Sequence, residues 1–110
     1  IREKMMRLRE AFIETRGKDK RLVRLMSESY SAFVLVFRGA LHLRAGLEVP
    51  KHDAGVVDAF AEWAGLDAAP MHQVESIKHG RGRGDRSLFD SYYKQLSKAV
   101  EFIDGFVHQK

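Results

Sequence analysis

The residues best suited to chemistry in this sequence are the cations around a glycine-rich stretch. The stretch runs from Gly80 to Asp85, and the cations on and beside it are Lys78, Arg81, Arg83 and Arg86. Glycine lets backbone N–H groups approach an anion, and arginine supplies forked donors that match phosphate. The stretch lacks the Walker A pattern and follows no predicted strand. Two interpretations remain: a basic loop that binds a phosphate-bearing ligand or an acidic partner, and a mobile loop whose charges keep the protein soluble.

Other polar clusters predict less. The hydroxyls between Ser27 and Ser31 have no nucleophile elbow or oxyanion-type loop around them, so we predict no catalytic residue there. His72, Glu75 and His79 share one face of a short predicted helix, but they lack the spacing of two histidines four residues apart with a glutamate between them. We therefore expect no metal site and no cofactor in this chain.

Five helical segments must position these residues, since apolar residues recur at helical spacing and no run alternates convincingly with period two. They are separated by Gly, Pro or Asp. The expected fold is all-α, an up-and-down bundle of four to five helices in a single domain over residues 1–110. The segments are expected at about 1–15, about 18–45, after Pro50, from Asp67 to near Gly80, and from Asp85 or Ser87 onward.

The second and fifth segments should supply the centre of the bundle because they carry the longest apolar stripes. From Ala32 to Phe37 the second is apolar all round, so it should be covered on more than one side or lie at a subunit interface. The least exposed residues should include Phe33, Phe37, Leu96 and Val100. The predicted stripe of the second segment is Leu22, Met26, Phe33, Phe37 and Leu41, and that of the fifth is Phe89, Tyr93, Leu96, Val100, Ile103 and Val107.

Four features predict helix ends. Pro50 suits the first turn of the third helix, and Gly65 followed by Leu66 resembles a Schellman ending. Asp67 is a predicted N-cap, and Ser87 with Asp90 approximates a capping box.

Composition excludes several classes of protein. The chain has 110 residues, a net charge of +4 and no cysteine, which excludes disulfides and thiolate-ligated zinc. The longest apolar run, 32–37, is far shorter than the roughly 20 residues that span a bilayer. We expect no membrane partner and a cytoplasmic location. A helical pattern is already running at Ile1, which predicts that the natural protein continues upstream.

Longer stretches carry the resemblance to a known family. They are 16–29 (RGKDKRLVRLMSES), 31–43 (SAFVLVFRGALHL), Val49-Pro50-Lys51 and 60–67 (FAEWAGLD), followed by an aromatic final helix. This pattern, over nearly the whole chain, resembles the C-terminal helical domain of bacterial nucleotidyltransferase-like proteins. That bundle is related to HEPN domains and to the substrate domains of aminoglycoside nucleotidyltransferases.

The resemblance implies a non-catalytic accessory domain that shapes a substrate cleft or mediates pairing. The chemistry would belong to a preceding α/β domain with a Gly-Ser turn and paired metal-binding carboxylates, neither of which is present here. The implied partners are that upstream domain, a second copy of the chain, and a nucleotide or nucleic acid. One alternative is a dimeric HEPN-type ribonuclease, for which Arg38 and His42 are the nearest residues, although their spacing is shorter than the usual motif. Another is a nucleic-acid-binding module that uses the basic residues within 1–24.

Overall fold

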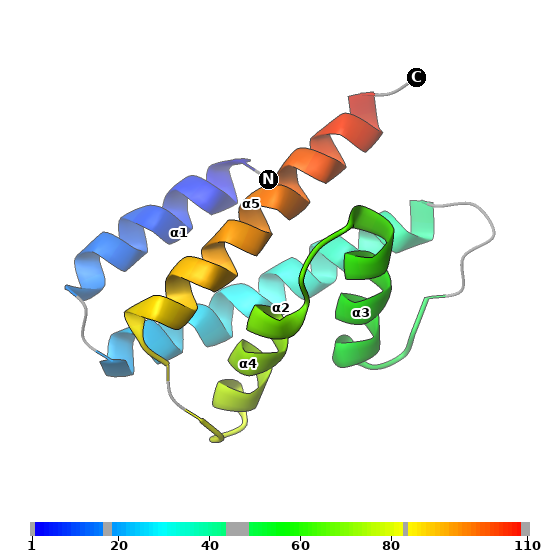
Figure 1. Cartoon of the computed structure of the whole chain (residues 1–110). Helices are drawn as coiled ribbons and strands as arrows, with labels where there is room; N and C mark the ends of the chain where they lie inside the picture. The colour runs from blue at the N-terminus through cyan, green and yellow to red at the C-terminus, as the bar shows by residue number, and fades with distance from the viewer. Residues whose placement is uncertain (1, 17–18, 44–48, 83, 109–110) are drawn as a thin grey trace.

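The computed structural model describes residues 2–16, 19–43, 49–82 and 84–108, and these form five helices without a strand. The predicted all-α bundle is confirmed (Figure 1). None of the described helices is long and apolar enough to cross a membrane. The helices are α1 (Arg2–Thr15), α2 (Asp19–Leu43), α3 (Asp53–Ala64), α4 (Ala69–Lys78) and α5 (Arg86–His108).

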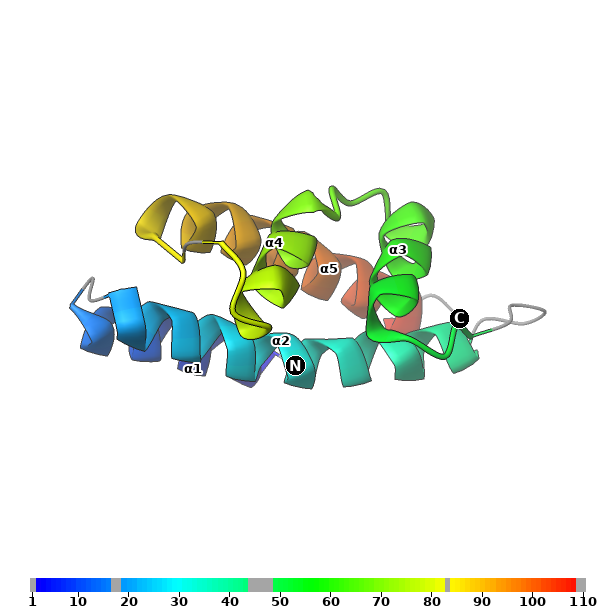
Figure 2. The ribbon, with the colours of Figure 1, turned by 90° about the horizontal axis from the view of Figure 1, so that it is seen from below.

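The helices lie in two layers. In Figure 2, α1 and α2 form the lower layer and α3, α4 and α5 the upper one. The α1–α2 connection makes an antiparallel pair, whereas the short α3–α4 hairpin returns the chain so that α5 runs in the same direction as α2 (Figure 1). The longest helix, α2, contacts all four others, which confirms it as the central element.

The core follows the predicted apolar stripes. Phe33, Phe37, Leu96 and Val100 are all buried, as expected. Phe37 stacks on Phe60 of α3 with ring centroids 4.2 Å apart, and so joins the two layers. On α5, however, Tyr92 is buried and Tyr93 only half-buried, so the inward face is rotated by one residue from the predicted stripe at that point.

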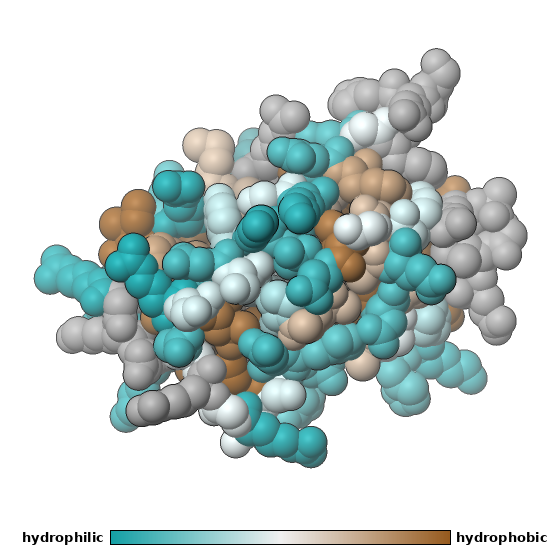
Figure 3. All heavy atoms as spheres, in the orientation of Figure 1, coloured by the Kyte–Doolittle hydropathy of each residue, from teal (hydrophilic) through white to brown (hydrophobic). Residues whose placement is uncertain are grey.

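One side of the apolar part of α2 remains uncovered. Val34 is 3% exposed, but Leu35 and Leu43 are each 69% exposed. We predicted that this part of the helix is covered on more than one side. Within it, Phe33, Val34 and Phe37 are buried, whereas Leu35 is not. On the face drawn in Figure 3, hydrophobic residues reach the surface as patches among hydrophilic side chains.

The start of α3 corrects one predicted boundary. Pro50 lies before the helix and not in its first turn, because α3 begins at Asp53. The proline packs instead on the first turn: a Cβ added to Gly55 would stand 2.8 Å from the Pro50 Cβ. The other end is as predicted, since Gly65 has a φ of 73° and the Leu66 N–H donates to the Ala61 carbonyl at 2.9 Å in the Schellman pattern.

Two predicted N-caps are shifted. Ala68 occupies the N-cap position of α4, and the Asp67 carboxylate accepts a hydrogen bond from the Ala69 N–H at 3.0 Å. Of the two predicted starts of α5, Asp85 and Ser87, the structure has Asp85 as the cap: its Oδ1 accepts from the Leu88 N–H at 2.9 Å, so the capping box predicted at Ser87 is wrong. An aspartate two residues earlier caps the helix because α5 already begins at Arg86.

Candidate ligand-binding site

The glycine-rich stretch is built into the fold at both ends. At its start, Gly80 has a φ of 81°, its N–H donates to the Ile77 carbonyl, and the Arg81 N–H donates to the Ser76 carbonyl at 2.7 Å. These bonds close α4 in a Schellman motif. At its end, Gly84 is buried, and a Cβ added there would stand only 2.6 Å from Cγ2 of Val23 on α2. These glycines therefore have structural roles whether or not the loop binds an anion.

The four cations predicted beside this loop do not share one location. Lys78, on the last turn of α4, lines a cleft between α2, α3 and α4, whereas Arg86 lines a different pocket between α1 and α5. Arg81 is exposed, and Arg83 lies outside the described residues. Of the predicted set, Lys78 and Arg86 therefore face separate cavities.

The cleft that Lys78 enters is organised around Tyr30 of α2. The Tyr30 hydroxyl donates to Oε2 of Glu75 on α4 at 2.5 Å. Lys78 Nζ donates to Ser31 Oγ and lies 5.9 Å from the centroid of the Tyr30 ring. These contacts hold the ammonium group of Lys78 against α2 and away from the glycine-rich stretch.

The remaining wall of the cleft comes from the segment that leads into α3. Lys51, His52 and Asp53 line it, with His79 on the α4 side, and the cavity volume is about 520 Å³. Because Asp53 begins α3, the amino-terminal end of that helix opens onto the cleft and adds partial positive charge. The cleft thus gathers two lysines and two histidines beside a helix N-terminus.

Both carboxylates in the cleft have partners within the protein. Asp53 forms an ion pair with Arg38 at 3.4 Å, and Glu75 accepts the Tyr30 hydrogen bond. Burial, followed by the hydrogen bond and the negative charge of Glu75, raises the pKa of Tyr30 well above its usual value. The tyrosine therefore remains a neutral hydrogen-bond donor at neutral pH, and it occupies one oxygen of Glu75.

The other polar candidates are distributed over separate contacts. His72 lies 2.6 Å from Asp58 Oδ1 on α3 and so is paired away from Glu75. Within the part of the chain that the structure describes, no group of three or more His, Asp or Glu residues could hold a metal ion. Ser29 bonds to Tyr92, which places that hydroxyl between helices.

Arg38, the arginine of the ribonuclease alternative, anchors the segment before α3. Its guanidinium group donates to the carbonyls of Pro50, at 2.8 Å, and Lys51, at 3.3 Å, in addition to its ion pair with Asp53. His42 is exposed on α2. Through these contacts, Arg38 positions the start of α3 and the adjacent wall of the cleft.

Sequence patterns did not identify Tyr30, Lys51 and His52 as neighbours of Lys78. These residues come from α2, from the segment before α3 and from α4, and only the packing of α2 against both other helices brings them together. Two local signals pointed to residues of this cleft: the cationic composition of 78–86 indicated Lys78, and the polar face weighed as a metal site contains Glu75 and His79.

Comparison with family models, curated proteins and solved structures found no significant match to this chain.

Proposed function

We propose that this chain is a non-catalytic helical accessory domain of a nucleotidyltransferase-like protein, and that it contributes a binding cleft for a phosphate-bearing ligand. The observation that carries the proposal is the position of Lys78. Its ammonium group is held at the cleft between α2, α3 and α4 by Ser31 and the Tyr30 ring, with Lys51 on the opposing segment.

The charges of the cleft favour an anion. Lys51 and Lys78 are exposed, while the two carboxylates are engaged by Arg38 and Tyr30. With Arg38 counted, three cations accompany the two carboxylates at the cleft, so the local balance is positive. Lysine binds phosphate as a compact point charge, and its contribution at an exposed site is weakened by salt.

The same contacts support binding in preference to catalysis. A general base must reach the proton that it abstracts, and a nucleophile must lie beside its base. Glu75 holds the Tyr30 hydroxyl, and Arg38 holds backbone carbonyls. In this proposal the chemistry belongs to a nucleotidyltransferase-like domain upstream, and the cytoplasmic location and a second copy of the chain remain predictions.

Calorimetric titration of the protein with pyrophosphate at two salt concentrations tests the cleft. Lys78→Ala should weaken binding by about fivefold, the effect of losing about 1 kcal/mol at an exposed charge, and should reduce the dependence on salt. The matched control is Lys94→Ala, which removes the same charge from an exposed position on α5. Equal affinities for the two variants would contradict the proposal.

Activity assays decide between the proposal and the ribonuclease alternative. Incubation with RNA, and separately with a nucleoside triphosphate and Mg²⁺, should give no product. Cleavage of RNA that disappears in both Arg38→Ala and His42→Ala would favour a ribonuclease instead. Because Arg38 also supports α3, the exposed His42 is the more informative of the two substitutions.

A further inference from the structure

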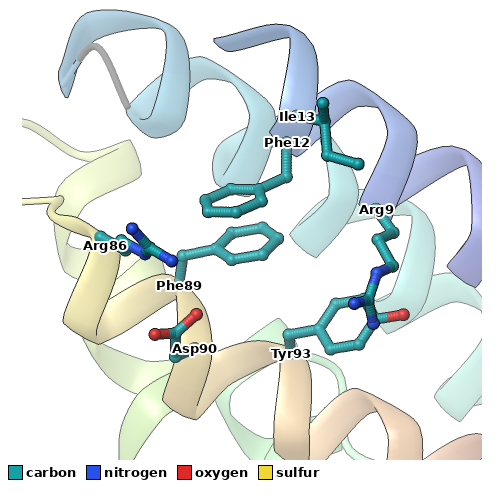
Figure 4. Close-up of a pocket in the computed structure, with 7 residues that line it drawn as sticks. All are labelled: Arg9, Phe12, Ile13, Arg86, Phe89, Asp90 and Tyr93. Atoms are coloured by element: carbon teal, nitrogen blue, oxygen red, sulfur yellow. The ribbon is translucent and has the colours of Figure 1, made fainter. Parts of the chain in front are cut away.

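A second cavity lies between α1 and α5, apart from the cleft of Lys78. Its volume is about 230 Å³, and Arg9 and Phe12 line it from α1 while Arg86, Phe89 and Tyr93 line it from α5. Figure 4 shows the rings of Phe12 and Phe89 between the two arginines, with Tyr93 beside Arg9. This pocket combines an aromatic floor with cationic edges.

Three rings form the floor as a continuous stack. Phe12 and Phe89 lie face to face, with ring centroids 4.2 Å apart and an interplanar angle of 7°. Phe89 in turn stacks on Tyr93, with centroids 5.8 Å apart. Phe89 is buried, whereas Phe12 and Tyr93 are only partly buried, and all three line the pocket. A planar group can lie against such a surface, because aromatic rings favour offset stacking or edge contacts.

The two arginines remain available to a ligand. Arg9 and Arg86 are exposed, and neither guanidinium group forms a hydrogen bond or ion pair with another residue in the described ranges. Arg86 is also the first residue of α5, where the helix adds partial positive charge. One carboxylate, that of Asp90, also lines the pocket. The local balance of two guanidinium groups and one carboxylate is positive.

We infer that the pocket between α1 and α5 binds a planar aromatic group that carries an anionic substituent, such as a phosphate or a carboxylate. The ring would lie against Phe12 and Tyr93, and the anion would meet Arg9 or Arg86. Guanidinium groups match the geometry of both anions through paired N–H donors. The cavity of about 230 Å³ accommodates one aromatic ring with its substituent.

Titration by NMR with phenyl phosphate tests both parts of the inference, with the side-chain signals of Arg9, Arg86 and Tyr93 as the readout. Phenyl phosphate should bind about tenfold more tightly than inorganic phosphate, which lacks the ring, because stacking on an aromatic side chain contributes that much or more. It should also bind more tightly than benzyl alcohol, which lacks the charge. If inorganic phosphate binds as tightly as phenyl phosphate, the inference is wrong.

Substitutions locate the binding and separate the two arginines from general surface charge. Arg9→Gln and Arg86→Gln should each weaken phenyl phosphate binding, whereas Arg7→Gln, an exposed arginine of α1 that does not line this pocket, should not. Asp90→Asn should strengthen binding by about twofold to fivefold, since it removes a repulsive charge worth up to about that factor at an exposed site. A loss that is equal for Arg7→Gln and Arg9→Gln, or an Asp90→Asn variant that binds more weakly, would overturn the site.

A separate titration with AMP distinguishes a nucleotide from a smaller aromatic acid as the ligand. Tighter binding of AMP than of phenyl phosphate, abolished by Arg9→Gln with Arg86→Gln, identifies a nucleotide. Binding of phenyl phosphate alone identifies a smaller aromatic acid. Binding of neither ligand at this pocket rejects the inference. Lys78→Ala, which alters only the other cleft, should leave the binding followed at the signals of Arg9, Arg86 and Tyr93 unchanged.

Discussion

Ser29 and Tyr92 meet in the interior at an oxygen-to-oxygen distance of 2.9 Å, although they are 63 residues apart in the chain. The Ser29 hydroxyl also donates to the carbonyl of Met26 at 3.0 Å. Because a serine hydroxyl has a single proton, Tyr92 must be the donor in the bond between them. The bond joins α2 to α5, and it satisfies a tyrosine that is 1% exposed.

Because Tyr92 is the donor, removing the Tyr92 hydroxyl and removing the Ser29 hydroxyl should reduce the free energy of unfolding by different amounts. Tyr92→Phe deletes the donor and leaves Ser29 bonded to Met26, so it should cost about 1 kcal/mol. Ser29→Ala leaves the Tyr92 hydroxyl buried without an acceptor and should cost more, up to about 3 kcal/mol. Urea unfolding of both variants measures the order. A larger loss for Tyr92→Phe would show that the assignment of the donor is wrong.

Stability should fall at alkaline pH because of the buried tyrosines. Burial raises the pKa of Tyr92 above the usual value of 10.0. Burial and Glu75 raise the pKa of Tyr30 as well. Since the folded-state pKa lies above the unfolded one, the stabilisation is complete below about pH 10 and is lost as the pH rises toward the folded value.

The slope of this loss is at most about 1.4 kcal/mol per pH unit for each tyrosine. The free energy of unfolding at pH 8, 9, 10 and 11 should therefore decline more steeply for the wild-type protein than for Tyr92→Phe. The two proteins differ in no other titratable group, so the difference between the two curves isolates Tyr92. Parallel curves would contradict the raised pKa.

The positions of the helices were predictable because each carries a long periodic stripe and a local stop signal. It was harder to predict which face of α5 is buried. Phe89 is followed by tyrosines three and four residues later, and both spacings place a side chain near the same face of a helix. Tyr92 is the buried one because it packs against Ser29, which belongs to another helix, α2. No pattern within α5 contains this information.

The candidate cleft was less predictable still. The charge run of 78–86 suggested one basic lip, but Lys78 closes α4 whereas Arg86 opens α5, and the turn between the two helices directs them into different cavities. Tyr30 and Lys51 join Lys78 only through tertiary packing. Composition could indicate that cations gather near a turn, but not which surface each one faces.

The buried aromatic stack provides a test of the core. Phe37 is 1% exposed and lies against Phe60, so Phe37→Ala should cost about 3 to 5 kcal/mol through lost burial and the cavity that remains. The control is Leu35→Ala, two residues away on the same helix but 69% exposed, which should change stability by no more than about 0.5 kcal/mol. Urea unfolding measures both. Similar losses at the two sites would mean that the orientation of α2 is wrong.

Two glycines should respond to alanine in opposite directions. At Gly84, which is buried beside α2, an added Cβ would lie 2.6 Å from Val23 Cγ2 and 3.0 Å from Met26 Cε. Relief of these contacts requires the side chains of Val23 and Met26 or the backbone at residue 84 to shift, so Gly84→Ala should cost about 1 to 3 kcal/mol. At Gly39, inside α2, nothing lies within 4 Å of an added Cβ, and Gly39→Ala should stabilise the protein by about 0.5 to 1 kcal/mol through helix propensity.

A double-mutant cycle identifies the cause of the loss at Gly84. If the contact with Val23 is responsible, Val23→Ala should cost less in the Gly84→Ala background than in the wild-type protein, because the smaller side chain makes room for the new methyl group. The same cycle between Val23 and Gly39 should show no coupling, since no atom of Val23 lies within 4 Å of the Cβ position of Gly39. Additive losses at Val23 and Gly84 would show that the close approach of the glycine-rich stretch to α2 does not limit the residue at position 84.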